Sequence, residues 1–243
     1  MIRAENVTRR YGSALAVASV NFSIAPGEIV GLLGANGAGK STLLRMLATY
    51  LAPDAGRILV CGHDAAREPV WIRRKIGYLA EHNALFDAMR VPEFLEFVAR
   101  VRGLDGALGE ERRAYVVERC GIADVLQKRI RECSKGFRQR IGLAAALLHD
   151  PPVLLLDEPT HGLDPLQVAA FRDLVRELRA GHAILLSSHV LAEVAAVATR
   201  LIVLHEGRVV LDERVQPLAA RAREQGCSLE DLVLAAVAQT RAS

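Results

Sequence analysis

The stretch Gly34-Ala35-Asn36-Gly37-Ala38-Gly39-Lys40-Ser41 fits the pattern G-x-x-x-x-G-K-[ST] at every fixed position. Its three glycines allow the backbone to curl closely around a chain of phosphates, because no Cβ atom stands in the way. Several backbone N–H groups then point inward and form a nest for an anion. In loops of this pattern the lysine reaches the outer phosphates, and the serine hydroxyl can ligate Mg²⁺. The stretch therefore predicts a phosphate-binding loop.

The segments on either side of this loop have the pattern that it requires. Residues 28–33 form an apolar run typical of a buried strand, and residues 42–47 read as a helix that leaves the loop. The N-terminus of that helix would direct its dipole at the phosphate. A glycine-rich turn that binds nothing is the alternative, and the strand before and the helix after argue against it.

A pair of carboxylates follows a second apolar run. Residues 153–156 read Val-Leu-Leu-Leu, the pattern of a central parallel strand covered on both faces, and Asp157 and Glu158 come next. Side chains at this end of such a strand point into the crevice where doubly wound sheets bind ligands. Asp157 fits the acid that holds the Mg²⁺ shell. A second carboxylate beside Asp157 is destabilised by charge repulsion, so a neighbouring cation or a catalytic role is needed to explain it. Glu158 could polarise a water molecule for attack on the terminal phosphate. The alternative is a solvated acidic pair at the end of a strand, with no catalytic or binding role.

The order of the remaining segments predicts an α/β fold, a P-loop NTPase core with a mainly parallel sheet. Residues 2–8 and 18–24 read as strands of a small N-terminal antiparallel β subdomain, joined by a loop at residues 9–13. We expect one domain over residues 1–243. Within it, residues 1–80 and 134–212 form the ATP-binding core, residues 81–133 an inserted α-helical subdomain, and residues 213–243 a C-terminal helical tail.

Several helices carry recognisable signals. Phe94, Phe97, Val98 and Val101 fall on one helical face, and the charged segment 104–133 is helix-like. Asp164-Pro165 looks like an N-cap followed by the first helical residue. Ser228 and Asp231 fit a capping box at the start of a tail helix.

Composition narrows the class of protein. The chain has 243 residues and a formal net charge of +3, which is too mild to argue for a nucleic-acid partner. Its four cysteines lie far apart and match no metal-binding spacing, so a reduced, cytosolic setting is the simple inference. No uncharged apolar stretch is long enough to span a bilayer, and the first residues lack a signal core.

The ordered set of motifs resembles the nucleotide-binding subunit of an ATP-binding cassette (ABC) transporter, and the resemblance runs through essentially the whole chain. Tyr11 sits where that family has its adenine-stacking aromatic, although the residue alone could equally just cover the small sheet. Residues 34–41 match the Walker A loop, residues 78–81 the Q-loop, and residues 134–137 the signature. Residues 153–158 match Walker B with the catalytic glutamate, residues 162–164 the D-loop, and Ser188-His189 the switch histidine.

The resemblance implies a role for each matching residue. ATP would be bound by Tyr11, Gly34, Ala35, Asn36, Gly37, Ala38, Gly39, Lys40, Ser41 and Thr42. Ser41, Glu81 and Asp157 would hold Mg²⁺, and Glu158 and His189 would be catalytic. Ser134, Gly136 and Asp164 would bind ATP in trans, because two such domains pair head to tail.

This chain departs from the family pattern in three places. Glu81 stands where a glutamine is usual, and the signature reads Cys-Ser-Lys-Gly-Phe instead of Leu-Ser-Gly-Gly-Gln. These features, together with residues 85–97, resemble the type-2 exporter branch, including multidrug and gliding-motility-like ATPases. His161 also sits where a small or amide residue is more usual.

The resemblance also implies partners and a location. Separate transmembrane permease subunits would complete the transporter, a second nucleotide-binding chain (a copy or a paralogue) would complete the ATP site, and the chain would lie peripherally on the cytoplasmic side of the cell membrane. The expected activity is ATP hydrolysis coupled to transport, with export favoured by the branch. Residues 81–102 are the expected docking region, where Leu85, Phe86 and Met89 either face a partner helix or are buried in the helical subdomain.

Three other classes compete with this interpretation. A soluble ABC ATPase acting on DNA or the ribosome would carry a long coiled-coil insert or two cassettes, and this chain has neither. A small-molecule kinase would not explain the signature, Glu158 and His189 together. A regulatory nucleotide-binding module without hydrolysis would not need Glu158 and His189.

Overall fold

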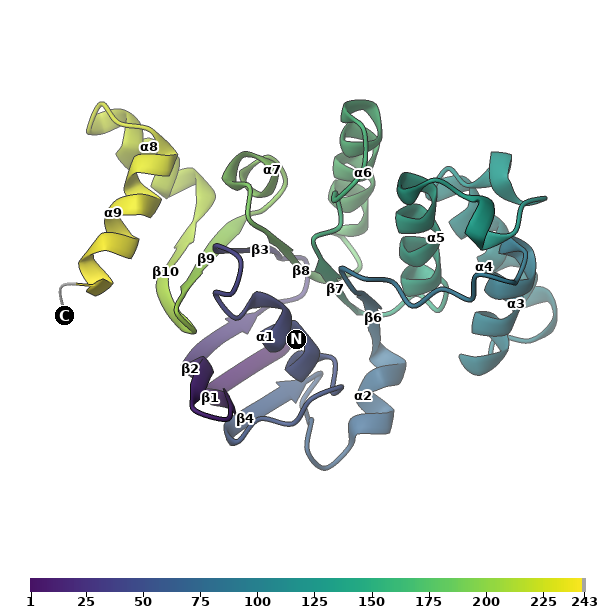
Figure 1. Cartoon of the computed structure of the whole chain (residues 1–243), viewed down its shortest axis with the longest axis horizontal. Coiled ribbons are helices and arrows are strands. Elements are labelled where there is room, and N and C mark those ends of the chain that lie inside the picture. The colour runs from purple at the N-terminus through teal and green to yellow at the C-terminus, as the bar shows by residue number, and fades with distance from the viewer. Residues whose placement is uncertain (242–243) are drawn as a thin grey trace.

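A six-stranded sheet forms the centre of the chain (Figure 1). The computed structural model describes the backbone of residues 1–241 and the side chains of residues 1–239. The strand order is β10-β9-β3-β8-β7-β6, all parallel except β10, which pairs antiparallel with β9. The strands are β3 (Ile29–Leu33), β6 (Ile76–Leu79), β7 (Val153–Asp157), β8 (Ala183–Ser188), β9 (Arg200–His205) and β10 (Arg208–Arg214). The predicted mainly parallel sheet is confirmed.

Both faces of this sheet are covered, which explains why its central strands β3, β7 and β8 are apolar up to the polar residues Asp157, Ser187 and Ser188 at the ends of β7 and β8. All five residues of β7 are buried. Successive side chains of a strand point to opposite faces, so Leu154 and Leu156 enter one hydrophobic core while Val153 and Leu155 enter the other. The first core includes the helices of the insert and those that follow it, and the second lies against the antiparallel sheet and the helix after the phosphate loop.

The antiparallel sheet is larger than predicted. Its order is β2-β1-β4-β5, formed by β1 (Ile2–Tyr11), β2 (Ala14–Ile24), β4 (Ala55–Val60) and β5 (His63–Asp64). The predicted loop at residues 9–13 is wrong, since Arg9 pairs with Val17 and Tyr11 pairs with Ala14. The strands can continue to their tip because Gly12, with φ of 58°, permits a turn of only two residues.

Nine α-helices lie around the two sheets in the described part of the chain. They are α1 (Lys40–Leu47), α2 (Pro69–Lys75), α3 (Val91–Val101), α4 (Gly106–Arg119), α5 (Lys135–Leu147), α6 (Pro165–Leu178), α7 (Leu191–Ala195), α8 (Val215–Glu224) and α9 (Leu229–Arg241). Helices α3, α4 and α5 gather beyond the β6 end of the large sheet, whereas α8 and α9 lie at the opposite end, beside β10 (Figure 1).

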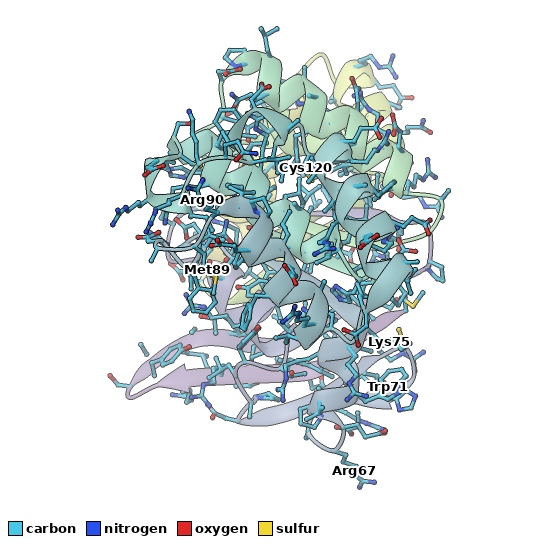
Figure 2. The ribbon with its side chains drawn as sticks, turned by 90° about the vertical axis from the view of Figure 1, so that its right-hand side faces the viewer. Arg67, Trp71, Lys75, Met89, Arg90 and Cys120 are labelled. Carbon is cyan, nitrogen blue, oxygen red and sulfur yellow. The ribbon has the colours of Figure 1, made fainter. Side chains whose placement is uncertain are left out.

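The side view in Figure 2 looks onto the helical end of the molecule. Met89, Arg90 and Cys120 lie in its upper, helical part, and Trp71 and Lys75 lie lower down, next to the antiparallel sheet. Among the helices of the described residues, none combines the length and the apolar character needed to cross a bilayer.

Two expectations for the insert need correction. Only Phe94 of the four apolar residues predicted to share a face of α3 is fully buried, and Phe97 and Val101 are 41% and 68% exposed. The ring of Phe97 instead packs edge-on against that of Phe86, with centroids 5.3 Å apart. The segment 104–133 is not helical throughout, because Gly121 takes a φ of 58° just after α4 and only two short 3₁₀ turns follow, Ala123–Val125 and Ile130–Glu132.

The helix caps were predicted correctly. Asp164 Oδ1 accepts a hydrogen bond of 2.9 Å from the backbone N–H of Gln167 at the start of α6. Ser228 and Asp231 cap α9 reciprocally. Helix α9 returns onto the first core through Val233. The predicted tail also includes residues 242 and 243, which lie outside the described residues.

Acid should destabilise the fold through His149, just after α5. Its ring Nε2 donates to the carbonyl of Ile76 at 3.1 Å, and burial, followed by the positive charge of Arg102, lowers the pKa of His149 from 6.5 to about 4. Between these two pH values the unfolded chain binds a proton that the folded chain does not, so stability is lost as the pH falls through this window. The full pKa difference corresponds to about 3 kcal/mol.

His149→Gln should therefore flatten the pH dependence of unfolding between pH 6.5 and 4, measured by urea denaturation. The exposed His82 provides the control, because His82→Gln should leave the slope of the wild type in place. Equal slopes for wild type and His149→Gln would contradict the assignment.

Candidate nucleotide-binding site

The phosphate loop lies between a central strand and a buried helix start, as its pattern predicts. Strand β3 is buried at every position and pairs with β8 and β9. Gly37 and Gly39 adopt φ values of 82° and 105°, which side-chain-bearing residues rarely take. A Cβ on Gly39 would also lie 2.3 Å from the carbonyl oxygen of Ala16. The glycine is therefore required here both by backbone conformation and by close approach.

Lys40, the first residue of α1, is held inside this loop. Its side chain is 6% exposed, and its Nζ donates to the carbonyl oxygens of Gly34 at 2.7 Å and Ala35 at 3.2 Å. The same ammonium lies 3.6 Å from Glu158 Oε1. The lysine charge is thus fixed within reach of both the loop and the carboxylate at the end of β7.

Asp157 and Glu158 share a hydroxyl group that the sequence did not single out. Ser187, at the end of β8, donates to Asp157 Oδ1 at 2.6 Å and accepts from the backbone N–H of Glu158 at 3.0 Å. Burial raises the pKa of Asp157, against hydrogen bonds from Ser187 and Ser41 that lower it, and the nearby Glu81 and Glu158 raise it further. A cation placed among these oxygens would favour the charged form of Asp157.

The side chain of Glu158 lies between two basic groups. It is 8% exposed, with Oε1 facing Lys40 and Oε2 bonded at 3.0 Å to Nδ1 of His189. Lys40 thereby supplies the cation that a second carboxylate at this position needs. The residue also adopts a φ of 48°, which is uncommon for a residue other than glycine and marks a conformation held by its surroundings.

One cavity of about 370 Å³ brings most of the predicted residues together. From the predicted set it is lined by Tyr11, Asn36, Gly37, Gly39, Lys40, Ser41, Thr42, Glu81, Glu158 and His189, and to these the structure adds Ala16 and His161. Tyr11 also lines this cavity and is 47% exposed, so part of its ring is open to a base. The carbonyls of Gly34 and Ala35 accept hydrogen bonds from Lys40, and Ala38 is buried within the loop. Asp157 is linked to the cavity by a hydrogen bond with the side chain of Ser41, which lines it.

Three predicted residues lie apart from this cavity. Ser134 caps α5 by accepting from the N–H of Phe137 at 3.3 Å, Gly136 lies in the first turn of the same helix, and Asp164 caps α6. Helices α5 and α6 meet here, because a Cβ on Gly136 would lie 2.6 Å from Gln167 Oε1. One chain therefore places these residues together, but outside the cavity that its own phosphate loop lines.

The oxygen donors beside the loop suit a magnesium ion. Ser41, Glu81 and Asp157 offer hydroxyl and carboxylate oxygens, and Mg²⁺ is typically bound by one or two carboxylates together with substrate phosphates. Within the described residues no cluster of three or more His, Cys, Asp or Glu side chains could hold a metal by itself. Both observations fit a metal that arrives with a nucleotide.

Comparison with known proteins agrees with this site. The family described as "ABC transporter" matches residues 17–161, and one described as "AAA domain, putative AbiEii toxin, Type IV TA system" matches residues 128–195. The chain is 40% identical to "Daunorubicin resistance ATP-binding protein DrrA3" of Streptomyces coeruleorubidus. That alignment covers 100% of this chain and 76% of DrrA3. It is 37% identical to "ABC transporter ATP-binding protein NatA" of Bacillus subtilis, over 93% of this chain and 94% of NatA.

A solved structure has the same fold over nearly the whole chain. "Structure of ATP binding subunit of ABC transporter" aligns with a TM-score of 0.89 and 30% identity, covering 97% of this chain and 99% of that one. "Dimeric Structure of MJ0796, a Bacterial ABC Transporter Cassette" aligns with a TM-score of 0.82 and 26% identity, over 88% and 99%. With its phosphate loop, paired carboxylates and these relatives, the chain belongs to the ABC transporter family, as an ATP-binding and ATP-hydrolysing subunit.

Proposed function

We propose that Glu158 is the general base of ATP hydrolysis in this chain, and that hydrolysis drives export through separate permease subunits. The observation that carries the proposal is the position of the Glu158 carboxylate, between Lys40 and His189 on the wall of the cavity that the phosphate loop lines. The test is phosphate release by the purified wild type and by Glu158→Gln, with the result expected in the Discussion.

Each group at the site has a distinct part in this reaction. The backbone N–H groups of the loop and the Lys40 ammonium bind the outer phosphates of ATP. Ser41, Asp157 and Glu81 would hold Mg²⁺, which supplies positive charge to the phosphate oxygens. The Glu158 carboxylate accepts a proton from the attacking water, and His189, bonded to Glu158 Oε2, orients that carboxylate and can reach the terminal phosphate.

The remaining ATP contacts come from a second chain in this proposal. Ser134, Gly136 and Asp164 lie outside the cavity of their own protomer, and Ser134 and Asp164 are exposed. A helix N-terminus such as that of α5 is suited to a phosphate group, which a head-to-tail dimer would bring to it. The dimeric cassette among the structural relatives supports this arrangement.

Relatives support the direction of transport. Besides the daunorubicin resistance protein, "Bacitracin transport ATP-binding protein BcrA" of Enterococcus faecalis is 34% identical over 92% of this chain. We infer the same branch for this chain and place it peripherally on the cytoplasmic face of the cell membrane. In this proposal residues 81–133 are the helical subdomain that faces the permease, residues 1–80 and 134–212 bind ATP, and residues 213–243 form an added tail.

The docking surface in this proposal centres on Phe86. Leu85 and Met89 pack partly buried against the first core, whereas Phe86 is 50% exposed and packs edge-on against Phe97. Phe86→Asp should therefore abolish stimulation of the ATPase by the co-purified membrane subunit while changing the melting temperature by no more than about 2 °C, because the lost burial is small.

The matched control for this variant is Leu108→Asp, because Leu108 is 53% exposed on α4 in the same subdomain. It should leave the stimulation intact. A large fall in melting temperature for Phe86→Asp with normal stimulation would instead assign Phe86 to the core.

A further inference from the structure

Gln139 is a buried polar residue on a helix whose inner side is otherwise small and apolar. Its side chain is 8% exposed, and both of its polar atoms are engaged. Nε2 donates to the backbone carbonyls of Glu158 and Pro159, at 3.3 Å each, and Oε1 accepts from Nδ2 of Asn83 at 3.1 Å. One side chain on α5 therefore joins the segment after β7 to the segment after β6.

The contact with Asn83 is built closely into the fold. Asn83 lies two residues after Glu81, in the connection between β6 and α3. A Cβ on Gly142, one turn further along α5, would lie 2.4 Å from Asn83 Nδ2. The glycine thus leaves the space in which Asn83 reaches Gln139, and a larger residue here would displace the Asn83 side chain.

The hydrogen bond from Gln139 to the carbonyl of Glu158 restrains the backbone of Glu158, which has an unfavourable conformation. Glu158 has a φ of 48°, a conformation that costs energy and persists only where neighbours enforce it. Its N–H donates to Ser187 Oγ at 3.0 Å, and its carbonyl accepts from the backbone N–H of His161 at 3.1 Å and from Gln139 Nε2 at 3.3 Å. Ser187 belongs to the sheet and His161 to the loop after β7, whereas Gln139 belongs to α5, so the Gln139 bond is the one of these three restraints that moves with the helix.

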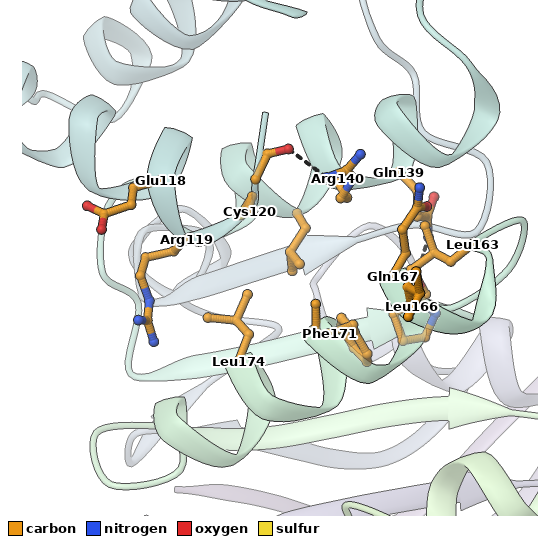
Figure 3. A pocket seen from close by; sticks show the side chains of 14 residues that line it. Glu118, Arg119, Cys120, Gln139, Arg140, Leu163, Leu166, Gln167, Phe171 and Leu174 are labelled. Atoms are coloured by element: carbon orange, nitrogen blue, oxygen red, sulfur yellow. Dashed lines mark hydrogen bonds between the residues drawn. The ribbon is translucent and has the colours of Figure 1, made fainter. Parts of the chain in front are cut away.

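The packing around Gln139 leaves room for such movement. A cavity of about 370 Å³ lies between α5 and α6, with Gln139, Leu143, Phe171 and Leu174 in its lining (Figure 3). Tightly packed cores resist displacement, whereas a void beside a helix removes contacts that would otherwise hold it. At this level the bonds from Gln139 Nε2 to the carbonyls of Glu158 and Pro159 connect α5 to the residues that follow β7.

We propose that Gln139 is a positioning residue, which sets the backbone of Glu158 according to where α5 and the Asn83 segment lie. A permease that moves the region around Glu81 and Asn83 would in this way adjust the carboxylate that activates water. The inference rests on the proposed role of Glu158 as general base and adds the route by which that base is placed.

The test compares steady-state ATPase kinetics of the purified chain for wild type, Gln139→Leu, Gln139→Glu, Asn83→Ala and the Asn83→Ala/Gln139→Leu double variant. Gln139→Leu should lower kcat about tenfold with the KM for ATP within about twofold, because no ATP contact is removed. Gln139→Glu keeps the acceptor for Asn83 but loses both donated bonds, so it should lose as much. Asn83→Ala should lower kcat about threefold, and the double variant should be no worse than Gln139→Leu alone.

The control variant is Gln127→Leu, the same change at an exposed position of the insert, which should behave as wild type. Wild-type kcat in Gln139→Glu, or strictly additive losses in the double variant, would overturn the positioning role. So would a fall in melting temperature with no change in kcat. If Glu158→Gln hydrolysed ATP at the wild-type rate, the proposed role of Glu158 as general base would be wrong, whatever the Gln139 variants do. If Glu158→Gln were inactive but Gln139→Glu had the wild-type kcat, only the positioning role of Gln139 would be wrong.

Discussion

Glu158→Gln is expected to lower ATP hydrolysis by a factor of about 10² to 10⁴ while ATP binding persists, since this is the range that a positioned general base contributes. The amide has nearly the shape of the carboxylate and can still bond to His189, whose Nδ1 lies 3.0 Å from Glu158 Oε2. It cannot accept the proton of the attacking water. It also removes a negative charge near the terminal phosphate, so ATP should stay bound and the dimer should accumulate.

Phosphate release and size-exclusion chromatography with ATP and Mg²⁺ measure the two halves of this prediction. Glu193→Gln is the matched control, because Glu193 is a partly buried carboxylate near the same sheet edge, bonded to Thr160 Oγ1 at 2.6 Å, and does not line the nucleotide cavity. It should hydrolyse ATP at the wild-type rate. Hydrolysis near the wild-type rate in Glu158→Gln would remove Glu158 from the mechanism and leave the paired carboxylates a structural feature.

The sequence predicted the parts of the site that depend on local chain geometry. The phosphate loop needs glycines at fixed spacing and a lysine at the start of a helix, and both are visible in eight consecutive residues. Asp157 and Glu158 were found because a continuous apolar run indicates a covered parallel strand, and side chains at its end face the crevice. In these cases one segment of chain determines where the functional side chain lies.

Residues whose role depends on contacts between distant segments could not be found in this way. Ser187 bonds Asp157 and Glu158 from a strand thirty positions further on, and Gln139 reaches Glu158 from a helix that precedes β7. The one available signal for Gln139 was a polar residue on the apolar side of a helix. Likewise, the exposure of Phe97 depends on the direction from which α4 and α5 approach α3, which the periodicity of α3 alone does not contain.

Mixing two inactive variants should restore ATP hydrolysis if each site is built from two chains. Lys40→Met removes the ammonium of the phosphate loop, and Gly136→Asp places a negative charge where the partner's terminal phosphate would arrive. The new Cβ would lie 2.6 Å from Gln167 Oε1, the end of a flexible side chain, so the helix start can accommodate it. Each variant alone should lose at least about 100-fold in rate, because every site in its homodimers contains one defective half.

In an equimolar mixture about half of the dimers are mixed, and each mixed dimer has one site with an intact Lys40 and an intact Gly136, so about a quarter of the wild-type rate should return. The control is each variant at the same total concentration, which should stay inactive. No recovery, with mixed dimers demonstrated by cross-linking, would mean that one chain completes its own pocket. Ser134 would then have to reach the phosphate loop of its own protomer, whereas in this chain it caps α5 outside the cavity that Lys40 lines.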